Sequence, residues 1–218
     1  MTEPLTTSRA NAARFDVVAA KWEEDPTRTG IARAVAEAIL ETVPLAGTER
    51  AMEFGCGTGL VTGLLAPSVG HLLAMDNSAG MLDVLRRKLP ELGIANVEPM
   101  EADLAQQMPA GPFDLVFSSM TLHHIEDVAG LIARVYAVLA PGGRIAFADL
   151  DKEDGSFHGA EVPGVMHHGF EAAELTRWLE DAGFADVRVR TAHRIRKSRE
   201  DGSTREYPVL LVTARRPA

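Results

Sequence analysis

Short apolar runs alternate with longer amphipathic stretches along most of this chain. The first amphipathic stretch carries Ile31, Val35, Ile39 and Val43 at four-residue intervals, which is the spacing of one face of a helix. Strands are expected over 50–54, 71–75, 97–100, 113–118 and 144–148, and helices over 31–43, 60–66, 79–88, 128–139 and 172–182. This alternation predicts helices layered around a largely parallel sheet.

The chain ends differently, because two strand-like segments follow each other after Phe184. The segments 187–195 and 207–214 are joined by Glu200-Asp201-Gly202-Ser203, a turn-rich link without room for a helix. Consecutive strands with such a link predict an antiparallel hairpin. The predicted fold class is therefore α/β and Rossmann-like, with a seven-stranded, mostly parallel sheet, an antiparallel C-terminal hairpin strand and helices on both faces.

Composition narrows the classes of protein that fit this pattern. The 218 residues are 46% hydrophobic and 24% charged, which suits a single domain with a substantial core. The net charge of -9 disfavours a nucleic acid partner. One cysteine excludes an internal disulfide, and neither a signal peptide nor an apolar run of membrane-spanning length is evident. We expect a cytoplasmic protein, monomeric or homodimeric, with no membrane partner.

Three glycines at alternate positions follow the first apolar run, in the sequence Glu53-Phe54-Gly55-Cys56-Gly57-Thr58-Gly59. Glycines here let the backbone turn sharply off a strand and approach a ligand closely. A dinucleotide-binding loop of the G-x-G-x-x-G type would need a glycine at position 60, where this chain has Leu60. No lysine follows as in a phosphate-binding P-loop, whereas Glu53 places a carboxylate just before the turn. The loop therefore predicts a site for a nucleotide cofactor that carries a cationic group.

This loop resembles motif I of the class I S-adenosylmethionine-dependent methyltransferases, in which a hydrophobic pair and an acid precede G-x-G-x-G. Within this class, the chain resembles the small-molecule enzymes of methyltransferase types 11 and 12. The resemblance extends from about Phe15 to Thr213. It implies a reversed seventh strand, as the terminal hairpin also predicts, and S-adenosylmethionine as the cofactor. The residues of the loop that it places at the cofactor are Glu53, Gly55, Cys56, Gly57 and Gly59.

Asp76 ends the second apolar run, 21 residues after Gly55. An acid at this place accepts hydrogen bonds from ribose hydroxyls in nucleotide-binding folds. The alternative is a helix cap, for which Asn77 and Ser78 are equally suited. We favour cofactor binding by Asp76 and Asn77. Met81 is placed at the adenine ring, although a methionine on the apolar face of a helix is also a common core residue.

Two further sets of cofactor residues rest on the resemblance alone. The segment Glu101-Ala102-Asp103-Leu104 stands where the family uses an acid for the adenine amino group and a neighbouring apolar residue for the ring. Asp103 and Leu104 are therefore expected at adenine. The end of the fourth strand resembles motif IV, which implies Ser118 and Ser119 beside the methionine part of the cofactor.

Five of the seven histidines fall in two segments, one at His123-His124 and the other between His158 and His168. The fold would bring both segments to the carboxyl ends of the fourth and fifth strands, where ligands bind in open α/β sheets. Histidine is the natural base for a hydroxyl, phenol or amine acceptor that must lose a proton. We predict His168 and His124 as candidate bases, and His123, His158 and His167 as acceptor-binding residues. The alternative is structural: the first pair at the entry to a helix, and His167 and His168 bonded to loop carbonyls.

Two segments are expected to close the acceptor site. Phe15 and Trp22 are seven residues apart and share a helical face, either as a cover over the acceptor or as packing residues. The link from 150 to 170 is long for a strand-to-helix connection and is expected to form a substrate lid. The single domain thus divides into an N-terminal helical cap over 1–45, a cofactor-binding core over 46–149, the lid over 150–170, and a helix and terminal hairpin over 171–218.

The combined prediction is an enzyme that transfers a methyl group from S-adenosylmethionine to an oxygen or nitrogen of a small-molecule acceptor. No metal site is expected, because the histidines and acids show no tight ligand spacing. A nucleophilic role for Cys56 is disfavoured, since a lone thiol in this loop serves as a small side chain. The alternatives are a catalytically silent S-adenosylmethionine-binding sensor or partner subunit, and a nicotinamide-dependent reductase, which Leu60 and the terminal hairpin disfavour.

Overall fold

The computed structural model describes residues 7–104, 107–158, 162–198 and 202–218. One sheet has the strand order β3-β2-β1-β4-β5-β7-β6. The strands are β1 (Arg50–Phe54), β2 (His71–Asp76), β3 (Val97–Glu101), β4 (Phe113–Ser119), β5 (Leu139–Leu150), β6 (Ala185–Ser198) and β7 (Thr204–Arg215). Strands β1 to β5 run parallel, whereas β7 pairs antiparallel with β5 and β6. The predicted fold class, including the reversed terminal hairpin, is confirmed.

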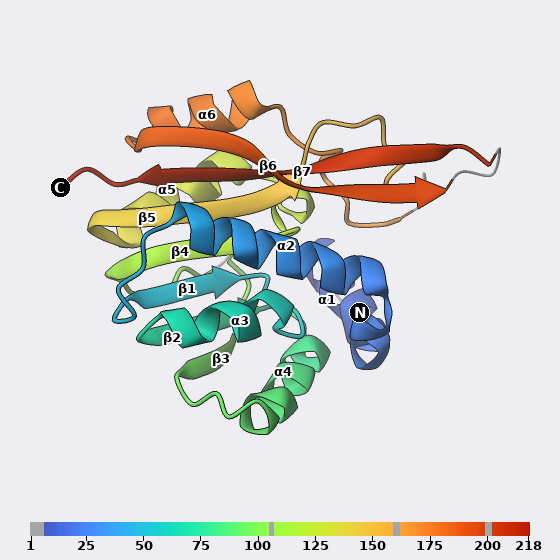
Figure 1. The fold of residues 1–218 in the computed structure, drawn as a ribbon, viewed down its shortest axis with the longest axis horizontal. Coiled ribbons are helices and arrows are strands. Elements are labelled where there is room, and N and C mark those ends of the chain that lie inside the picture. Colours follow the sequence, from blue (N-terminus) through green and yellow to red (C-terminus); the bar gives the residue numbers. More distant parts are fainter. Residues whose placement is uncertain (1–6, 105–106, 159–161, 199–201) are drawn as a thin grey trace, which may run out of the picture.

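Helices cover both faces of this sheet (Figure 1). They are α1 (Thr7–Val18), α2 (Pro26–Thr42), α3 (Leu60–Leu65), α4 (Ala79–Glu91), α5 (Val128–Val138) and α6 (Ala172–Asp181), with short 3-10 helices η1 (Ala19–Glu24), η2 (Ala66–Ser68) and η3 (Leu122–His124). Within the described residues, none of the helices is both long and apolar enough to cross a bilayer.

Neighbouring residues of a strand enter opposite halves of the core. Ala51 and Leu72 pack with α2 and α3 in one buried cluster, whereas Met52 and Leu73 pack with α5 and α6 in another. Side chains alternate between the two faces of a strand, and here helices bury both faces. This burial explains why the central strands are continuous apolar runs in the sequence.

Polar caps fix where the helices begin. Asp25 accepts a hydrogen bond from the backbone N–H of Thr27 and precedes Pro26, the first residue of α2. The hydroxyl of Ser78 accepts a bond from the N–H of Met81 at the start of α4. The capping role considered for the segment after β2 thus belongs to Ser78.

The terminal hairpin is longer than predicted from the sequence. Pairing between β5 and β7 ends at Leu150 and Val209, whereas β6 and β7 continue to pair as far as Ser198 and Thr204. A two-stranded ribbon therefore projects past the end of β5 (Figure 1).

Candidate active site

A cavity of about 1020 Å³ lies at the carboxyl ends of β1, β2 and β4. It is lined by the loops that follow these strands, by the N-terminal cap and by part of the link between β5 and α6. Single ligand pockets usually have volumes of about 300–1,000 Å³. The cavity is therefore large enough for a nucleotide-sized molecule together with a second, smaller ligand.

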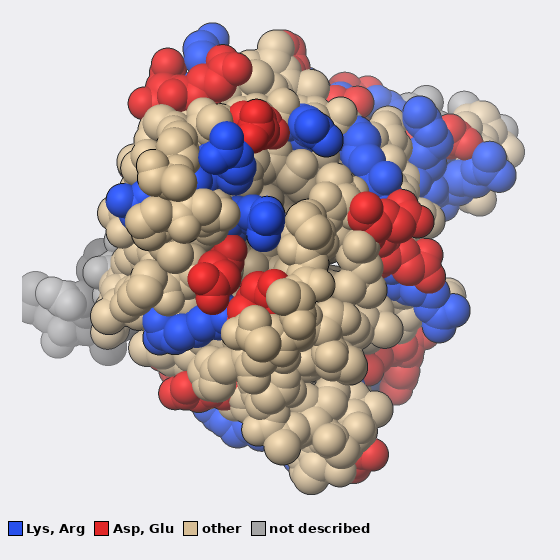
Figure 2. Space-filling model, turned by 60° about the vertical axis from the view of Figure 1, so that its left-hand side comes forward, with Lys and Arg blue, Asp and Glu red and all other residues tan. Residues whose placement is uncertain are grey.

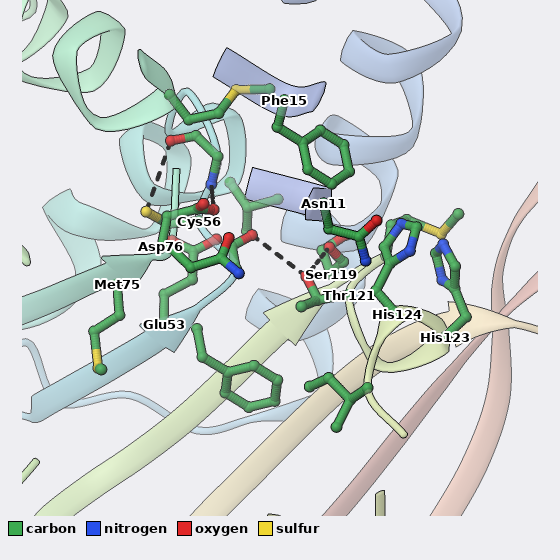
Figure 3. Close-up of a pocket in the computed structure, with 18 of the residues that line it drawn as sticks. Asn11, Phe15, Glu53, Cys56, Met75, Asp76, Ser119, Thr121, His123 and His124 are labelled. Atoms are coloured by element: carbon green, nitrogen blue, oxygen red, sulfur yellow. Dashed lines mark hydrogen bonds between the residues drawn. The ribbon is translucent and has the colours of Figure 1, made fainter. Parts of the chain in front are cut away.

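Most of the residues predicted from the sequence line this cavity. Those predicted at the cofactor are Glu53, Gly55, Cys56, Gly57, Asp76, Asn77, Met81, Asp103 and Leu104, and those predicted at the acceptor are Phe15, Trp22, His123, His124 and His158. Figure 3 shows Glu53, Cys56 and Asp76 at one end of the cavity and the imidazoles of His123 and His124 at the other. The cavity thus brings together the two groups of residues that the sequence separates.

The glycine loop leaves β1 with left-handed backbone at its first glycine. Gly55 has φ +66°, and a Cβ atom there would lie 2.2 Å from Oγ1 of Thr121. The N–H of Gly57 donates to Oδ2 of Asp76 at 2.8 Å, so the loop is tied to the end of β2. Only glycine combines this conformation with such a close approach to the segment after β4.

Gly59 corrects one expectation, because it does not line the cavity. Its φ is +80°, and a Cβ atom there would lie 2.3 Å from Cδ1 of Leu85 on α4. The third glycine of the loop is therefore needed for packing between α3 and α4. Its regular spacing from Gly55 and Gly57 concealed this difference in the sequence.

Glu53 is a buried carboxyl group at the floor of the cofactor end. Its side chain is 2% exposed, and its Oε2 atom accepts a hydrogen bond of 2.5 Å from the hydroxyl of Thr62. The pKa of Glu53 is raised to about 8, mainly by burial; the hydrogen bond from Thr62 opposes this rise and the nearby charge of Asp76 adds to it. A cationic ligand group close to Glu53 would favour its ionised form.

Asp76 holds two backbone groups and still faces the cavity. Its oxygens accept bonds from Gly57 N–H at 2.8 Å and from Ser78 N–H at 2.9 Å. Burial raises the pKa of Asp76, although these two bonds act in the opposite direction. A carboxylate has about four acceptor positions. Asp76 can therefore accept further bonds from a ligand while it organises the glycine loop.

Cys56 behaves as a small apolar side chain. Its Sγ atom is buried and lies 3.7 Å from the carbonyl oxygen of Gly57. Burial raises the pKa of this thiol well above its ordinary value, and the charges of Asp76 and Glu53 add to the effect. A thiol held in this neutral form is a poor nucleophile.

The N-terminal cap is fastened to the cofactor end by polar contacts. Oδ1 of Asp16 accepts bonds from the hydroxyl of Ser78 at 2.5 Å and from the N–H of Gly80 at 2.8 Å. Lys88 on α4 pairs with Glu23 of η1. Phe15 and Trp22 contact each other edge to face with ring centres 5.6 Å apart, and both line the cavity. The cap therefore covers the cavity from the side of α4.

At the opposite end, a carboxylate and two imidazoles form a chain of polar contacts. Oδ1 of Asp149 lies 2.7 Å from Nδ1 of His123, and Nε2 of His123 lies 3.1 Å from Nε2 of His158. Burial alone would raise the pKa of Asp149, but the charge and hydrogen bonds of His123 outweigh it, so the pKa lies below its ordinary value. Asp149 is thus an ionised partner that fixes the ring of His123.

Among the residues that the structure describes, His124 has a hydrogen-bond partner at one ring nitrogen only. Its Nδ1 atom donates to the carbonyl oxygen of Gly164 at 2.7 Å, and the amide of Asn11 donates to the same oxygen at 3.1 Å. This tautomer leaves a lone pair on Nε2. Burial and the charge of His123 lower the pKa of His124 to about 4, and similar causes lower the pKa of His158 to about 3. Both rings are neutral near pH 7.

Two predicted histidines lie outside the cavity, which corrects their assignment. His168 has a side chain that is 55% exposed and lies 3.7 Å from a carboxylate oxygen of Glu153. Nε2 of His167 donates to the carbonyl oxygen of Ile125 at 2.9 Å. The link runs back beside β5 here, with Lys152 N–H donating to Phe170 O. The ring of His167 is thus bonded to a loop carbonyl, as in the structural alternative, and the ring of His168 is largely exposed.

Ser118 is a further correction. Its hydroxyl is buried and donates to the carbonyl oxygen of Phe54 at 2.9 Å, so it joins β4 to β1 below the cavity. Ser119 lines the cavity instead. Successive residues of a strand point to opposite faces, and the resemblance did not distinguish between the two serines.

The sequence did not predict three residues of the site. Arg14 and Lys197 line the cavity, and Asp149 is the hydrogen-bond partner of His123. Asp149 stands near the end of a buried strand, as Asp76 does, and this shared position was a usable signal. Lys197 reaches the cavity from the projecting ribbon of β6, and Arg14 reaches it from α1. Nothing in their spacing from the glycine loop indicates this approach.

Residues 52–147 match the family described as methyltransferase domain. The chain is 33% identical over 177 residues to trans-aconitate 2-methyltransferase of Methylobacterium radiotolerans, which covers 77% of this chain and 64% of that protein. It is 32% identical over 160 residues to ubiquinone biosynthesis O-methyltransferase of Xylella fastidiosa, which covers 66% of this chain and 64% of that protein.

A solved structure gives a similarity at the level of the fold. The S-adenosylmethionine dependent methyltransferase from Mesorhizobium loti superimposes with a TM-score of 0.66 at 25% identity, covering 84% of this chain and 98% of that chain. The present chain spans less than two thirds of the length of either curated relative named above.

Proposed function

We propose that this chain transfers a methyl group from S-adenosylmethionine to an oxygen or nitrogen of a small-molecule acceptor, because residues 52–147 match a methyltransferase domain and the sheet has the strand order expected for the class I fold. One observation carries the proposal: a single cavity has buried acids beside the glycine loop at one end and imidazoles at the other (Figure 3). Its volume of about 1020 Å³ provides room for both reactants.

The residues at the glycine loop fit the cofactor. Glu53 is buried without a cationic partner among the described residues, and the left-handed backbone at Gly55 and Gly57 opens a close approach to the chain. In this proposal Glu53 compensates the cationic methionine part, and Asp76 with Asn77 accepts bonds from the ribose. Met81, Asp103 and Leu104 line the part of the cavity left for adenine.

S-adenosylmethionine supplies a methyl group that its sulfonium already activates, so the protein contributes mainly position and exclusion of water. The N-terminal cap performs the second task, because Asp16 and Asn11 attach α1 to α4 and to the link after β5. Thr121 and Ser119 line the segment between the loop and the imidazoles. The acceptor atom would therefore be directed along the cavity from the histidine end.

His124 is the residue proposed to take the proton of the acceptor. Its Nδ1–H is bonded to Gly164, which leaves the Nε2 lone pair for the acceptor. A pKa of about 4 makes this imidazole a weak base. A weak base suffices when the acceptor atom becomes strongly acidic as the methyl group arrives. His124 is preferred to the earlier candidate His168, whose side chain is 55% exposed and does not line the cavity.

Oxygen as the acceptor atom receives support from the relatives. A trans-aconitate 2-methyltransferase and a ubiquinone biosynthesis O-methyltransferase, each about a third identical to this chain over the matched part, are named for small oxygen-containing molecules. Nitrogen stays within the proposal because a neutral imidazole serves an amine equally well.

The proposal is tested in two stages with the purified protein. Calorimetry with S-adenosylmethionine, S-adenosylhomocysteine and NADH is expected to show micromolar binding of the two sulfur compounds only. A screen of small hydroxyl, carboxylate and amine acceptors is then followed by mass spectrometry for a mass gain of one methyl group with release of S-adenosylhomocysteine. Binding without turnover on any acceptor would favour the silent sensor, and binding of NADH alone would overturn the proposal.

A further inference from the structure

We propose that the acceptor carries an anionic oxygen group, a carboxylate or a phosphate, and that Arg14 and Lys197 bind this group at the histidine end of the cavity. The inference rests on the proposed methyl transfer and specifies the chemical class of its acceptor. It is carried by two cations that line the cavity and have no carboxylate partner within the described residues.

Arg14 comes from α1 and lies beside the imidazoles. Its guanidinium carbon is 4.8 Å from the centre of the Phe15 ring, and that ring contacts His124 edge to face at 5.6 Å. Across the described parts of the chain, no carboxylate lies within 4.0 Å of Arg14. Burial lowers the pKa of this guanidinium. A partly desolvated cation of this kind gains from an anionic ligand that enters the cavity.

Lys197 approaches the same imidazoles from the projecting ribbon. Its Nζ atom lies 3.8 Å from the centre of the Phe157 ring and donates to the Phe157 carbonyl oxygen at 2.6 Å. The ring of Phe157 is 4.7 Å from that of His158. An ammonium group has three donors, so the one bond to Phe157 leaves others for a ligand.

Lys197 is partly desolvated, and among the described residues no carboxylate lies within ion-pair distance of its ammonium group. Burial lowers the pKa of Lys197, and the carboxylates of Asp25 and Glu153 act on it only from beyond ion-pair distance. Asp25 is engaged elsewhere, since it pairs with Arg28 at 3.4 Å and caps α2. The positive charges of Lys197 and Arg14 both help to lower the pKa of His158. The two cations therefore act on one common region of the cavity.

Basic residues elsewhere on the ribbon are compensated. Arg194 and Arg196 both pair with Glu206, and Arg205 pairs with Asp154. Over the face shown in Figure 2, acidic and basic side chains likewise lie close to one another. In a chain of net charge -9, two cations that line a cavity and have no direct carboxylate partner among the described residues are a local exception. An anion small enough to enter the cavity would compensate the charges of these two cations.

The inference is tested by binding to the protein saturated with S-adenosylhomocysteine. The probes are matched pairs that differ in charge: 3,4-dihydroxybenzoate and its amide, trans-aconitate and its trimethyl ester, and phenyl phosphate and phenol. At least one anion is expected to bind in calorimetry, and its neutral partner at least about tenfold more weakly. A carboxylate or a phosphate among the binders identifies which anion the site prefers. Failure of every anion, or equal binding of the neutral partners, would overturn the inference.

Variants distinguish the two cations from a general charge effect. Arg14→Gln and Lys197→Gln are each expected to weaken the anion by at least about tenfold, since hydrogen bonds to charged groups contribute about 1.5–3 kcal/mol. Arg33→Gln on α2 and Arg196→Gln on β6 remove equal charge outside the cavity and should leave affinity unchanged. Affinity for S-adenosylhomocysteine should also stay unchanged in all four variants. If Arg14→Gln or Lys197→Gln weakened S-adenosylhomocysteine binding as much as anion binding, that cation would be assigned to the cofactor carboxylate. Its proposed role at the acceptor would then be overturned.

The same panel separates this inference from the proposed function. Methyl transfer to neutral acceptors alone, with Arg14→Gln and Lys197→Gln fully active, would retain the methyltransferase and overturn the anionic acceptor. Failure to bind S-adenosylhomocysteine would overturn the proposed function itself.

Discussion

The Nδ1 atom of His123 lies 2.7 Å from Oδ1 of Asp149, and this contact joins the carboxyl ends of β4 and β5. The carbonyl oxygen of His123 also accepts bonds from the N–H groups of Met166 and His167 in the link after β5. One residue thus connects two parallel strands with the segment predicted as a substrate lid. The position of the acceptor end depends on this connection.

Replacing Asp149 with Asn is expected to destabilise the protein by about 3 kcal/mol or more near pH 7, because removal of one partner from a buried charged pair is costly. Because the pKa of Asp149 is lowered in the folded state, its contribution is present above the unfolded value of about 4 and is lost as pH falls through the folded value. Urea denaturation at pH 7 and at pH 3 measures the difference.

The exposed pair of Asp186 with Arg215 provides the matched control. Asp186→Asn is expected to change stability by no more than about 1 kcal/mol, since exposed pairs contribute little. Equal effects of the two Asp to Asn changes at pH 7 would contradict the structural role of Asp149.

Asp76→Ala is expected to weaken S-adenosylmethionine binding by at least about tenfold. The change removes the predicted bonds to the ribose and also the acceptor of Gly57 N–H, which holds the glycine loop. Calorimetry measures the affinity, with Asp83→Ala on the exposed side of α4 as a control. An unchanged dissociation constant for Asp76→Ala would exclude this carboxylate from the cofactor site.

Glu53→Gln is expected to stabilise the protein without cofactor at alkaline pH. The pKa of Glu53 is about 8 when folded and about 4.5 when unfolded, so the folded state holds more protons between these values and stability falls as pH rises through this range. Glutamine removes that dependence. We expect an advantage over the wild type of at least about 1 kcal/mol at pH 9 and none at pH 4, measured by thermal and urea unfolding.

The exposed Glu180→Gln on α6 serves as the control and should show the pH dependence of the wild type. If Glu53→Gln were instead less stable than the wild type at pH 9, the carboxyl group would be ionised in the empty site, contrary to the effect of its burial.

His124→Ala is expected to lower kcat for a hydroxyl or amine acceptor by about 100-fold, the lower end of general base contributions. His168→Ala should leave kcat within about twofold of the wild type, because its ring lies outside the cavity. Both variants should retain affinity for S-adenosylmethionine, which calorimetry checks independently. A loss of turnover in His168→Ala alone would restore the base first considered from the sequence.

Much of this architecture could be predicted because it depends on local patterns. Central strands such as Ala51–Phe54 are buried on both faces, so they are short apolar runs, and amphipathic helices separate them. Gly55 and Asp76 could be identified because each stands at the end of an apolar strand, where ligands bind in open α/β sheets. Gly55 allows the sharp turn after its strand, and Asp76 is a polar residue at the end of the next strand. Their positions in the cavity follow from the parallel order of β1 and β2.

The acceptor end was predicted less well because it is assembled from distant segments. His123 and His124 line the cavity, whereas His167 and His168 do not. All four follow buried strands in the sequence, but the ring of His167 is bonded to the carbonyl oxygen of Ile125 and the ring of His168 is largely exposed. The periodicity of the sequence does not encode such a difference.

The sequence by itself therefore determined the fold class, the cofactor loop and the acids near it, because each is written in contiguous residues with a regular spacing. The tertiary structure alone decided which serine faces the cavity, which histidines reach it, and that Arg14 and Lys197 meet there. Those choices depend on which face of a strand is covered and on contacts between segments far apart in the chain. Local propensity carries no information about either.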